Sequence, residues 1–193
     1  MNIQLAENSA LQRRELPKSS QVTAFIDQMV KSLIRQETAK LPSPQTLPSS
    51  LDEALYNSTA GFKILLSSVS MHLDDAWRRK LNSQIDSLLA LDEWDEADMP
   101  PTANSIRTFV RTLLTLGARR RPGMGATSNG NLIATWTVGE NRLTVECQKD
   151  DEIRYSLVRN TGHIDRVAGV THLTRLIEVL APFHPEIWFN NAV

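Results

Sequence analysis

The stretch Leu91-Asp92-Glu93-Trp94-Asp95-Glu96-Ala97-Asp98-Met99-Pro100-Pro101 separates two parts of this chain that have different hydrophobic periods. Before it, apolar residues recur every three or four positions, as in helices; beyond Met124 they alternate with a period of two, as in strands. The stretch itself holds five carboxylates, a tryptophan and a Pro-Pro pair that stops a helix. We therefore expect an α+β fold, with a helical N-terminal part, an antiparallel meander of three to four strands and a C-terminal helix.

Composition excludes several classes of function. The 193 residues are 41% apolar and 22% charged, as in an ordinary globular protein, and the net charge of −1 gives no general attraction to nucleic acid or anionic membrane. Cys147 is the only cysteine, so an internal disulfide is impossible. No apolar run reaches the length of a membrane span, and the first residues lack a signal-like apolar core. We expect a cytoplasmic protein without membrane contact.

The first fifty residues predict an arm, a helix and a linker. Residues 1–20 are polar and unpatterned, whereas residues 21–40 place Phe25, Met29 and Leu33 on one apolar stripe with helical spacing. Residues 41–50 contain three prolines and three serines, which is typical of a linker. The rest of the chain, 51–193, is expected to form one α+β domain.

Helices are predicted over 51–117. Ser50 and Glu53 fit a capping box, and the helix that they begin is expected to falter at Asn57–Gly61, with a strand at Gly61–Leu66 as the minor alternative. A second helix is expected over Leu73–Leu91. Thr102 caps a third, which Gly117 ends.

A sheet is predicted over 124–159, with a short edge strand near Met124–Thr127. Three further strands carry alternating apolar faces, which are Leu132/Ala134/Trp136/Val138, Leu143/Val145/Cys147 and Ile153/Tyr155/Leu157. Residues 160–169 are expected to form a loop, and Thr171 to cap a final helix over 171–181. An apolar tail, 186–193, follows.

The motif Trp94-Asp95, Asp98-Met99-Pro100-Pro101, a capped helix, and Gly130 followed by Trp136 resembles a loose group of small uncharacterised bacterial proteins. Their pattern is roughly Trp-Asp-Gly-x-Gly-Ala-x-Pro-Pro-Ser, a helix, then Asp-Gly-Gly…Glu-Trp and a strand meander. The resemblance covers about Leu88 to Leu157. This chain has Glu96 and Asp98 in place of glycines, and Thr135 in place of the glutamate. The resemblance implies the fold and no activity.

The carboxylate cluster has a structural and a functional interpretation, and it does not fit a calcium loop. A calcium loop needs a glycine-assisted turn and a distal glutamate, which the cluster lacks. The simplest reading is a solvated acidic turn that Trp94 anchors to the core. A docking turn for a basic partner is the functional reading, with Trp94, Asp95, Glu96 and Asp98 as its residues.

The sequence favours no enzyme class, and we expect no cofactor. The four histidines and Cys147 lack the spacing of a zinc site, and His163/Asp165 is the only close pair of histidine and carboxylate. Gly123-Met124-Gly125 lacks the lysine of a phosphate loop. Strand parity places Cys147 inside the protein, as a small hydrophobe.

Arg119-Arg120-Arg121 is the strongest basic feature. With Arg107 and Arg111 it could form a phosphate-binding patch, although cations at a helix C-terminus also complement the helix dipole.

The leading hypothesis is a non-enzymatic bacterial protein-interaction module of the antitoxin, immunity or accessory-subunit type, with a protein partner or a second copy. Its binding residues are the docking turn, the stripe Phe25/Met29/Leu33 and Trp188 in the tail. The alternative is a nucleic-acid-binding regulator that uses Arg119–Arg121, and the third is a metal- or carboxylate-dependent hydrolase.

Overall fold

The computed structural model describes residues 28, 50–95, 97–160 and 162–190, without the side chain of Glu93. The predicted arm, the helix over 21–40 apart from Gln28, and the linker apart from Ser50 lie outside these residues. So do Phe25, Met29, Leu33 and Glu96.

Three helices form the first half of the domain: α2 (Leu51–Ser68), α3 (Asp75–Leu88) and α4 (Ala103–Leu116). Short 3-10 turns at Ser70–His72 and Leu91–Glu93 follow α2 and α3. The caps at Ser50 and Thr102 are confirmed, because each hydroxyl accepts a hydrogen bond from the amide three residues on, at 3.2 Å. Gly117 ends α4 in the left-handed conformation, as expected.

The predicted interruption of the first of these helices is wrong. α2 is continuous through Asn57–Gly61, and its buried residues Leu55, Phe62, Leu65 and Leu66 keep one helical face in the core. The Ser58 hydroxyl donates to the carbonyl of Pro101 at 3.0 Å, so a tertiary contact occupies the polar group that suggested a break. The second helix is also shorter than predicted, since Asp74 caps it and it ends at Leu88.

The sheet has five antiparallel strands rather than three or four, in the order β1-β2-β3-β4-β5. Their bounds are β1 Gly123–Ala126, β2 Leu132–Val138, β3 Asn141–Cys147, β4 Glu152–Asn160 and β5 Ile164–His172. The apolar faces predicted for the three central strands are buried, except that Val138 is partly exposed.

β5 corrects the prediction of a loop over 160–169 and of a helix cap at Thr171. Gly169 pairs with Tyr155 across the β4–β5 ladder, and a Cβ on Gly169 would come within 2.9 Å of the tyrosine hydroxyl. The glycine therefore makes room for an aromatic ring inside a strand, although its sequence context is typical of a loop.

The C-terminal segment begins later than predicted and is divided. It consists of a 3-10 turn (Leu173–Arg175), α5 (Leu176–Leu180), a second 3-10 turn (Ala181–Phe183) and α6 (Glu186–Phe189). Of the predicted apolar tail, residues 186–189 form α6, in which Trp188 and Phe189 are buried, and residues 191–193 lie outside the described residues. Phe189 meets Trp136 edge to face, with ring centroids 5.2 Å apart.

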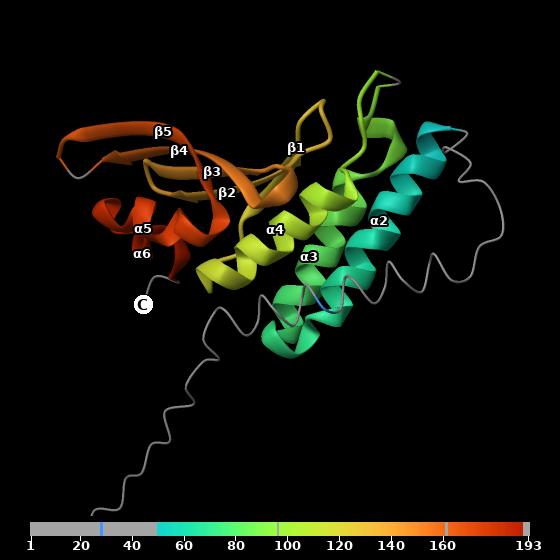
Figure 1. Ribbon diagram of the computed structural model, residues 1–193, viewed down its shortest axis with the longest axis horizontal. Coiled ribbons are helices and arrows are strands. Elements are labelled where there is room, and N and C mark those ends of the chain that lie inside the picture. The colour runs from blue at the N-terminus through green and yellow to red at the C-terminus, as the bar shows by residue number, and fades with distance from the viewer. Residues whose placement is uncertain (1–27, 29–49, 96, 161, 191–193) are drawn as a thin grey trace, which may run out of the picture.

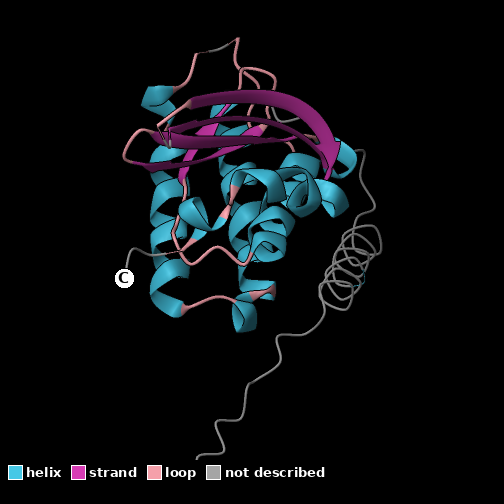
Figure 2. Cartoon of the chain, turned by 90° about the vertical axis from the view of Figure 1, so that its left-hand side faces the viewer, coloured by secondary structure: helices cyan, strands magenta, loops and turns pink. Residues whose placement is uncertain are grey.

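The domain is layered (Figure 1), with α4, α5 and α6 against one face of the sheet, α2 packed beyond α4, and α3 packed against α2 and the edge strand β1. Figure 2 shows the longer helices on that face of the sheet. Buried Ser105 joins α4 to the sheet: its hydroxyl donates to Cys147 O and accepts from Leu132 N, both at 2.7 Å. No helix in the described ranges is long and apolar enough to cross a membrane.

Candidate protein-docking site

The acidic turn, defined as residues 91–101, is fixed at its start by its tryptophan. The indole Nε1–H of Trp94 donates to Leu88 O at 2.7 Å, which satisfies a carbonyl in the last turn of α3. Asp95 O then accepts from Asp98 N at 3.0 Å and closes a tight turn. This geometry agrees with the expectation that Trp94 anchors the turn.

The end of the turn is fixed to the loop between β1 and β2. Met99 N donates to Ser128 O and Thr102 N donates to Gly130 O, each at 3.0 Å. Gly130 has φ +74°, and a Cβ there would lie 2.7 Å from Pro100 O. Only glycine fits both the backbone conformation and the close approach to Pro100 O.

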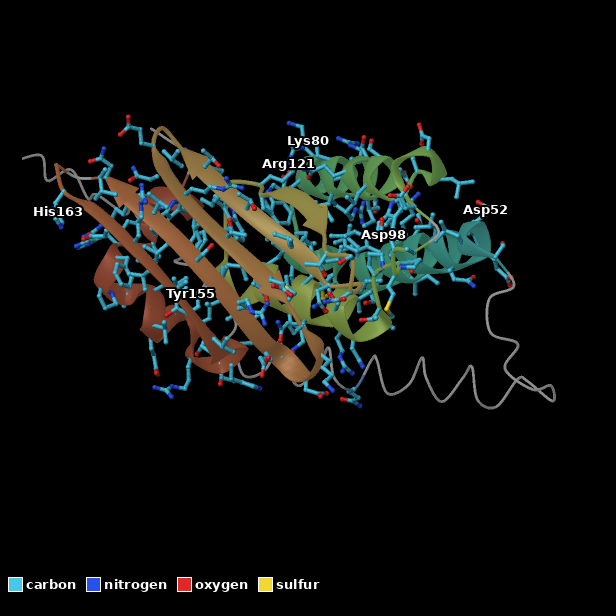
Figure 3. The ribbon with its side chains drawn as sticks, turned by 90° about the horizontal axis from the view of Figure 1, so that it is seen from above. Asp52, Lys80, Asp98, Arg121, Tyr155 and His163 are labelled. Atoms are coloured by element: carbon cyan, nitrogen blue, oxygen red, sulfur yellow. The ribbon has the colours of Figure 1, made fainter. Side chains whose placement is uncertain are left out.

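A pocket of about 520 Å³ lies between the turn, α3 and β1. Figure 3 labels Asp98, which belongs to the turn side of this pocket. The lining residues come from three segments: Ser83, Gln84, Ser87 and Leu88 of α3; Trp94 and Asp98 of the turn; and Met124, Ala126, Thr127 and Ser128 of β1 and its loop.

Hydrogen-bond acceptors dominate the polar part of the lining. Gln84 Nε2 donates to Pro122 O at 3.1 Å, which orients the amide, and Gln84 Oε1 is buried rather than exposed to the pocket. Asp98 adds a carboxylate, and serine and threonine add hydroxyls that both donate and accept. The lining contains no Lys, Arg or His. The pocket is therefore suited to a group that donates hydrogen bonds and carries positive charge.

The structure brings two of the predicted docking residues, Trp94 and Asp98, into this pocket, while Asp95 is exposed beside it. Trp188 is elsewhere: it is fully buried in α6 and has no surface to offer a partner in this conformation. The lining residues of α3 and of the loop after β1 were not singled out from the sequence, because isolated serines, threonines and glutamines on a polar helix face carry no local signal.

The arginine segment, defined as Arg119–Arg121, has a fixed backbone. Arg119 N and Arg120 N donate to Phe189 O at 2.9 and 2.8 Å, and Arg120 O accepts from the indole of Trp136 at 2.8 Å. The side chains of Arg119 and Arg121 are exposed.

The two helix arginines expected to extend this patch have other partners. Arg111 forms an ion pair with Asp151 and is almost buried, and Arg107 donates to Asn104 Oδ1 at 2.9 Å. A five-arginine patch is therefore not assembled.

Metal and thiol chemistry find no support in the described part of the chain. No group of three or more His, Cys, Asp or Glu side chains there is placed to hold a metal ion. Asp165 of the His163/Asp165 pair bonds to Arg159, at 2.7 and 3.1 Å. Burial raises the pKa of the Cys147 thiol to about 12, so the thiol stays protonated and unreactive near neutral pH.

Comparison with protein-family models, curated proteins and solved structures gives no match to this chain.

Proposed function

We propose that this protein is a non-enzymatic interaction module that docks a basic side chain of a partner protein at the acidic turn. In a bacterial setting this describes an antitoxin, an immunity-type protein or an accessory subunit, which acts by covering a surface of its partner. The partner's residue is an arginine or lysine on an exposed segment, and it enters the pocket between Trp94 and Gln84.

The observation that carries the proposal is the Asp98 carboxylate in a pocket whose lining contains no Lys, Arg or His. A guanidinium group has five N–H donors and no acceptor, so it complements a lining rich in acceptors. Hydrogen bonds to charged groups contribute about 1.5–3 kcal/mol. The indole of Trp94 adds a surface over which a cation is stabilised by roughly 0.5–2 kcal/mol.

Affinity capture with charge-reversed variants tests the proposal. The full chain carrying Asp95→Lys and Asp98→Lys is compared with wild type and with Glu152→Lys/Glu178→Lys, which makes the same change in net charge at exposed positions elsewhere. We expect a stoichiometric partner from the native host on wild type and control, and its loss from the Asp95/Asp98 variant. Retention of that partner by the Asp95/Asp98 variant would contradict the proposal.

Nucleic-acid binding through the arginine segment is the second candidate, since Arg119 and Arg121 are exposed on a backbone that three hydrogen bonds fix. Phosphate contacts give an affinity that falls steeply with salt. Binding of duplex DNA or RNA at low salt, lost on changing all three arginines to glutamine, would support this candidate. Absence of binding at low salt would remove it.

A further inference from the structure

Strand β1 is at one end of the strand order, and its backbone points hydrogen-bonding groups away from the sheet. In an antiparallel pair, alternate residues bond to the neighbouring strand and the residues between them point outward. Thr127 N donates to Asn131 O at 2.9 Å, in register with the β1–β2 pairs, so Gly125 also bonds to β2. The N–H and C=O groups of Met124 and Ala126 therefore point toward the free edge of the sheet.

Two other outward carbonyls on this edge have partners from the rest of the fold. Pro122 O, just before β1, accepts from Gln84 Nε2 of α3 at 3.1 Å. Ser128 O, just after β1, accepts from Met99 N of the acidic turn at 3.0 Å, and Met99 forms a parallel β-bridge with Asn129. The edge is therefore bonded at both ends, and at one end its partner is already strand-like.

The pocket lies at the part of the edge between these two bonds. Met124 and Ala126 line it, with α3 on one side and the acidic turn on the other. Among the described residues, neither has a hydrogen-bond partner on that side. Pro122 and Ser128 are about 20 Å apart along a strand, whereas an extended segment of three residues is about 10 Å long and is short enough to lie between them.

Charge determines which kind of segment fits this gap. Asp98 directly precedes Met99 at one end of the gap, and the lining contains no Lys, Arg or His. Side chains of a strand alternate between two faces while its backbone pairs along the edge. A basic residue in an added strand can therefore contact Asp98 while the backbone of the segment bonds to β1.

We propose that the partner's basic residue lies in an extended segment that adds to the free edge of β1 as a short sixth strand. The segment exchanges backbone hydrogen bonds with Met124 and Ala126, and its arginine or lysine contacts Asp98. This inference rests on the proposed docking of a basic side chain and adds the conformation of the partner. The partner offers a loop or terminus that can extend, and not a helix, whose backbone groups are bonded internally.

Three capped peptides, titrated into the full chain and observed by NMR, test the pairing separately from the docking. They are Thr-Arg-Thr, the same peptide with all three residues N-methylated, and Thr-citrulline-Thr. N-methylation removes the backbone donors and keeps the charge. We expect Thr-Arg-Thr to shift the amide signals of Met124 and Ala126, and the N-methylated peptide to bind at least about tenfold more weakly.

The outcomes of this titration distinguish the two proposals. Equal affinities of Thr-Arg-Thr and its N-methylated form would overturn the strand addition and leave the docking of a cation intact. Equal affinities of the arginine and citrulline peptides, or no binding by either, would contradict the docking function itself. Slow hydrogen exchange of the Met124 and Ala126 amides in the free protein would show that its own chain or a second copy already covers the edge, and would also overturn the strand addition.

Ala126→Pro tests the same contact from the side of the protein. Proline removes the outward N–H and is tolerated on an edge strand where that group faces away from the sheet. The matched control is Ala168→Pro on β5, an exposed position outside the pocket where the same alternation, followed across β3 and β4, points the N–H to the other edge. We expect Ala126→Pro to weaken Thr-Arg-Thr binding at least about fivefold, and the control to change it by less than twofold. Equal affinities of the two variants would contradict the strand addition, and the peptide comparison does not depend on either variant.

Discussion

The acidic turn and the arginine segment are the two strongest charge clusters in the sequence, and the fold treats them differently. The turn borders a pocket that Asp98 and Trp94 line together with residues of α3 and of the β1–β2 loop. The arginine segment is fixed by its backbone, while the nearby Arg111 is committed to Asp151. A run of like charges in the sequence is therefore a candidate binding site only where the fold places a pocket next to it.

The largest effect is expected for Gly130→Ala, because Gly130 is where the acidic turn contacts the loop between β1 and β2. The left-handed backbone and the contact with Pro100 O together should lower the free energy of unfolding by about 3 kcal/mol. Gly139→Ala is the control, because Gly139 also has positive φ (+59°) but no heavy atom within 4 Å of the added Cβ. It should cost about 1 kcal/mol. Urea unfolding measures both free energies. Equal losses for the two variants would show that the close approach of residue 130 to Pro100 O adds no cost of its own.

Asp98→Asn sharpens the comparison at the pocket itself. Loss of the charge that faces the partner's cation should weaken binding by about 2 kcal/mol, or roughly thirtyfold. Asp95→Asn, outside the pocket lining, should weaken it less than about threefold. Calorimetric titration with the captured partner measures both affinities. Equal losses of affinity would show that a general electrostatic attraction, rather than the pocket, binds the partner.

Trp136→Phe probes how the arginine segment is held. The change leaves Arg120 O without its indole donor and should lower the free energy of unfolding by about 1.5 kcal/mol. Affinity for the partner should stay the same, because Trp136 is a buried residue of β2 and does not line the pocket. A stability unchanged within error would mean that this hydrogen bond is not needed to order the segment.

The smallest effect is expected for Arg119→Gln/Arg120→Gln/Arg121→Gln. Cations at exposed or partly exposed positions contribute little to stability, so unfolding should change by less than about 0.5 kcal/mol and partner binding by less than twofold. A large loss of partner affinity in this variant would show that the partner binds at the arginine segment rather than at the acidic turn.

The sequence predicted the features that rest on strong local signals. The caps at Ser50 and Thr102, the left-handed Gly117 and the inward faces of β2, β3 and β4 follow from side-chain chemistry and period, and all are confirmed apart from the partial exposure of Val138. The anchoring role of Trp94 followed from the isolation of one large apolar residue among carboxylates.

The errors arose where tertiary contacts override local preference. β5 was missed because Gly169 and its polar neighbours are typical of a loop, whereas the ring of Tyr155 needs that glycine. The break in α2 was predicted from Asn57–Gly61, yet Phe62 and Ser58 hold the helix from its inner side. The pocket could not be predicted, since it joins α3, the turn and the β1 loop, which are separated by up to 45 residues.

Titration of the labelled full chain with a short arginine peptide, observed by NMR, tests the central claim most directly. Each of the four tryptophans gives its own indole signal, and a citrulline peptide of the same shape is the neutral control. The account predicts selective shifts of the Trp94 indole and the Gln84 side-chain amide with the arginine peptide alone. Unchanged Trp94 and Gln84 signals, or equal shifts with the citrulline peptide, would contradict it.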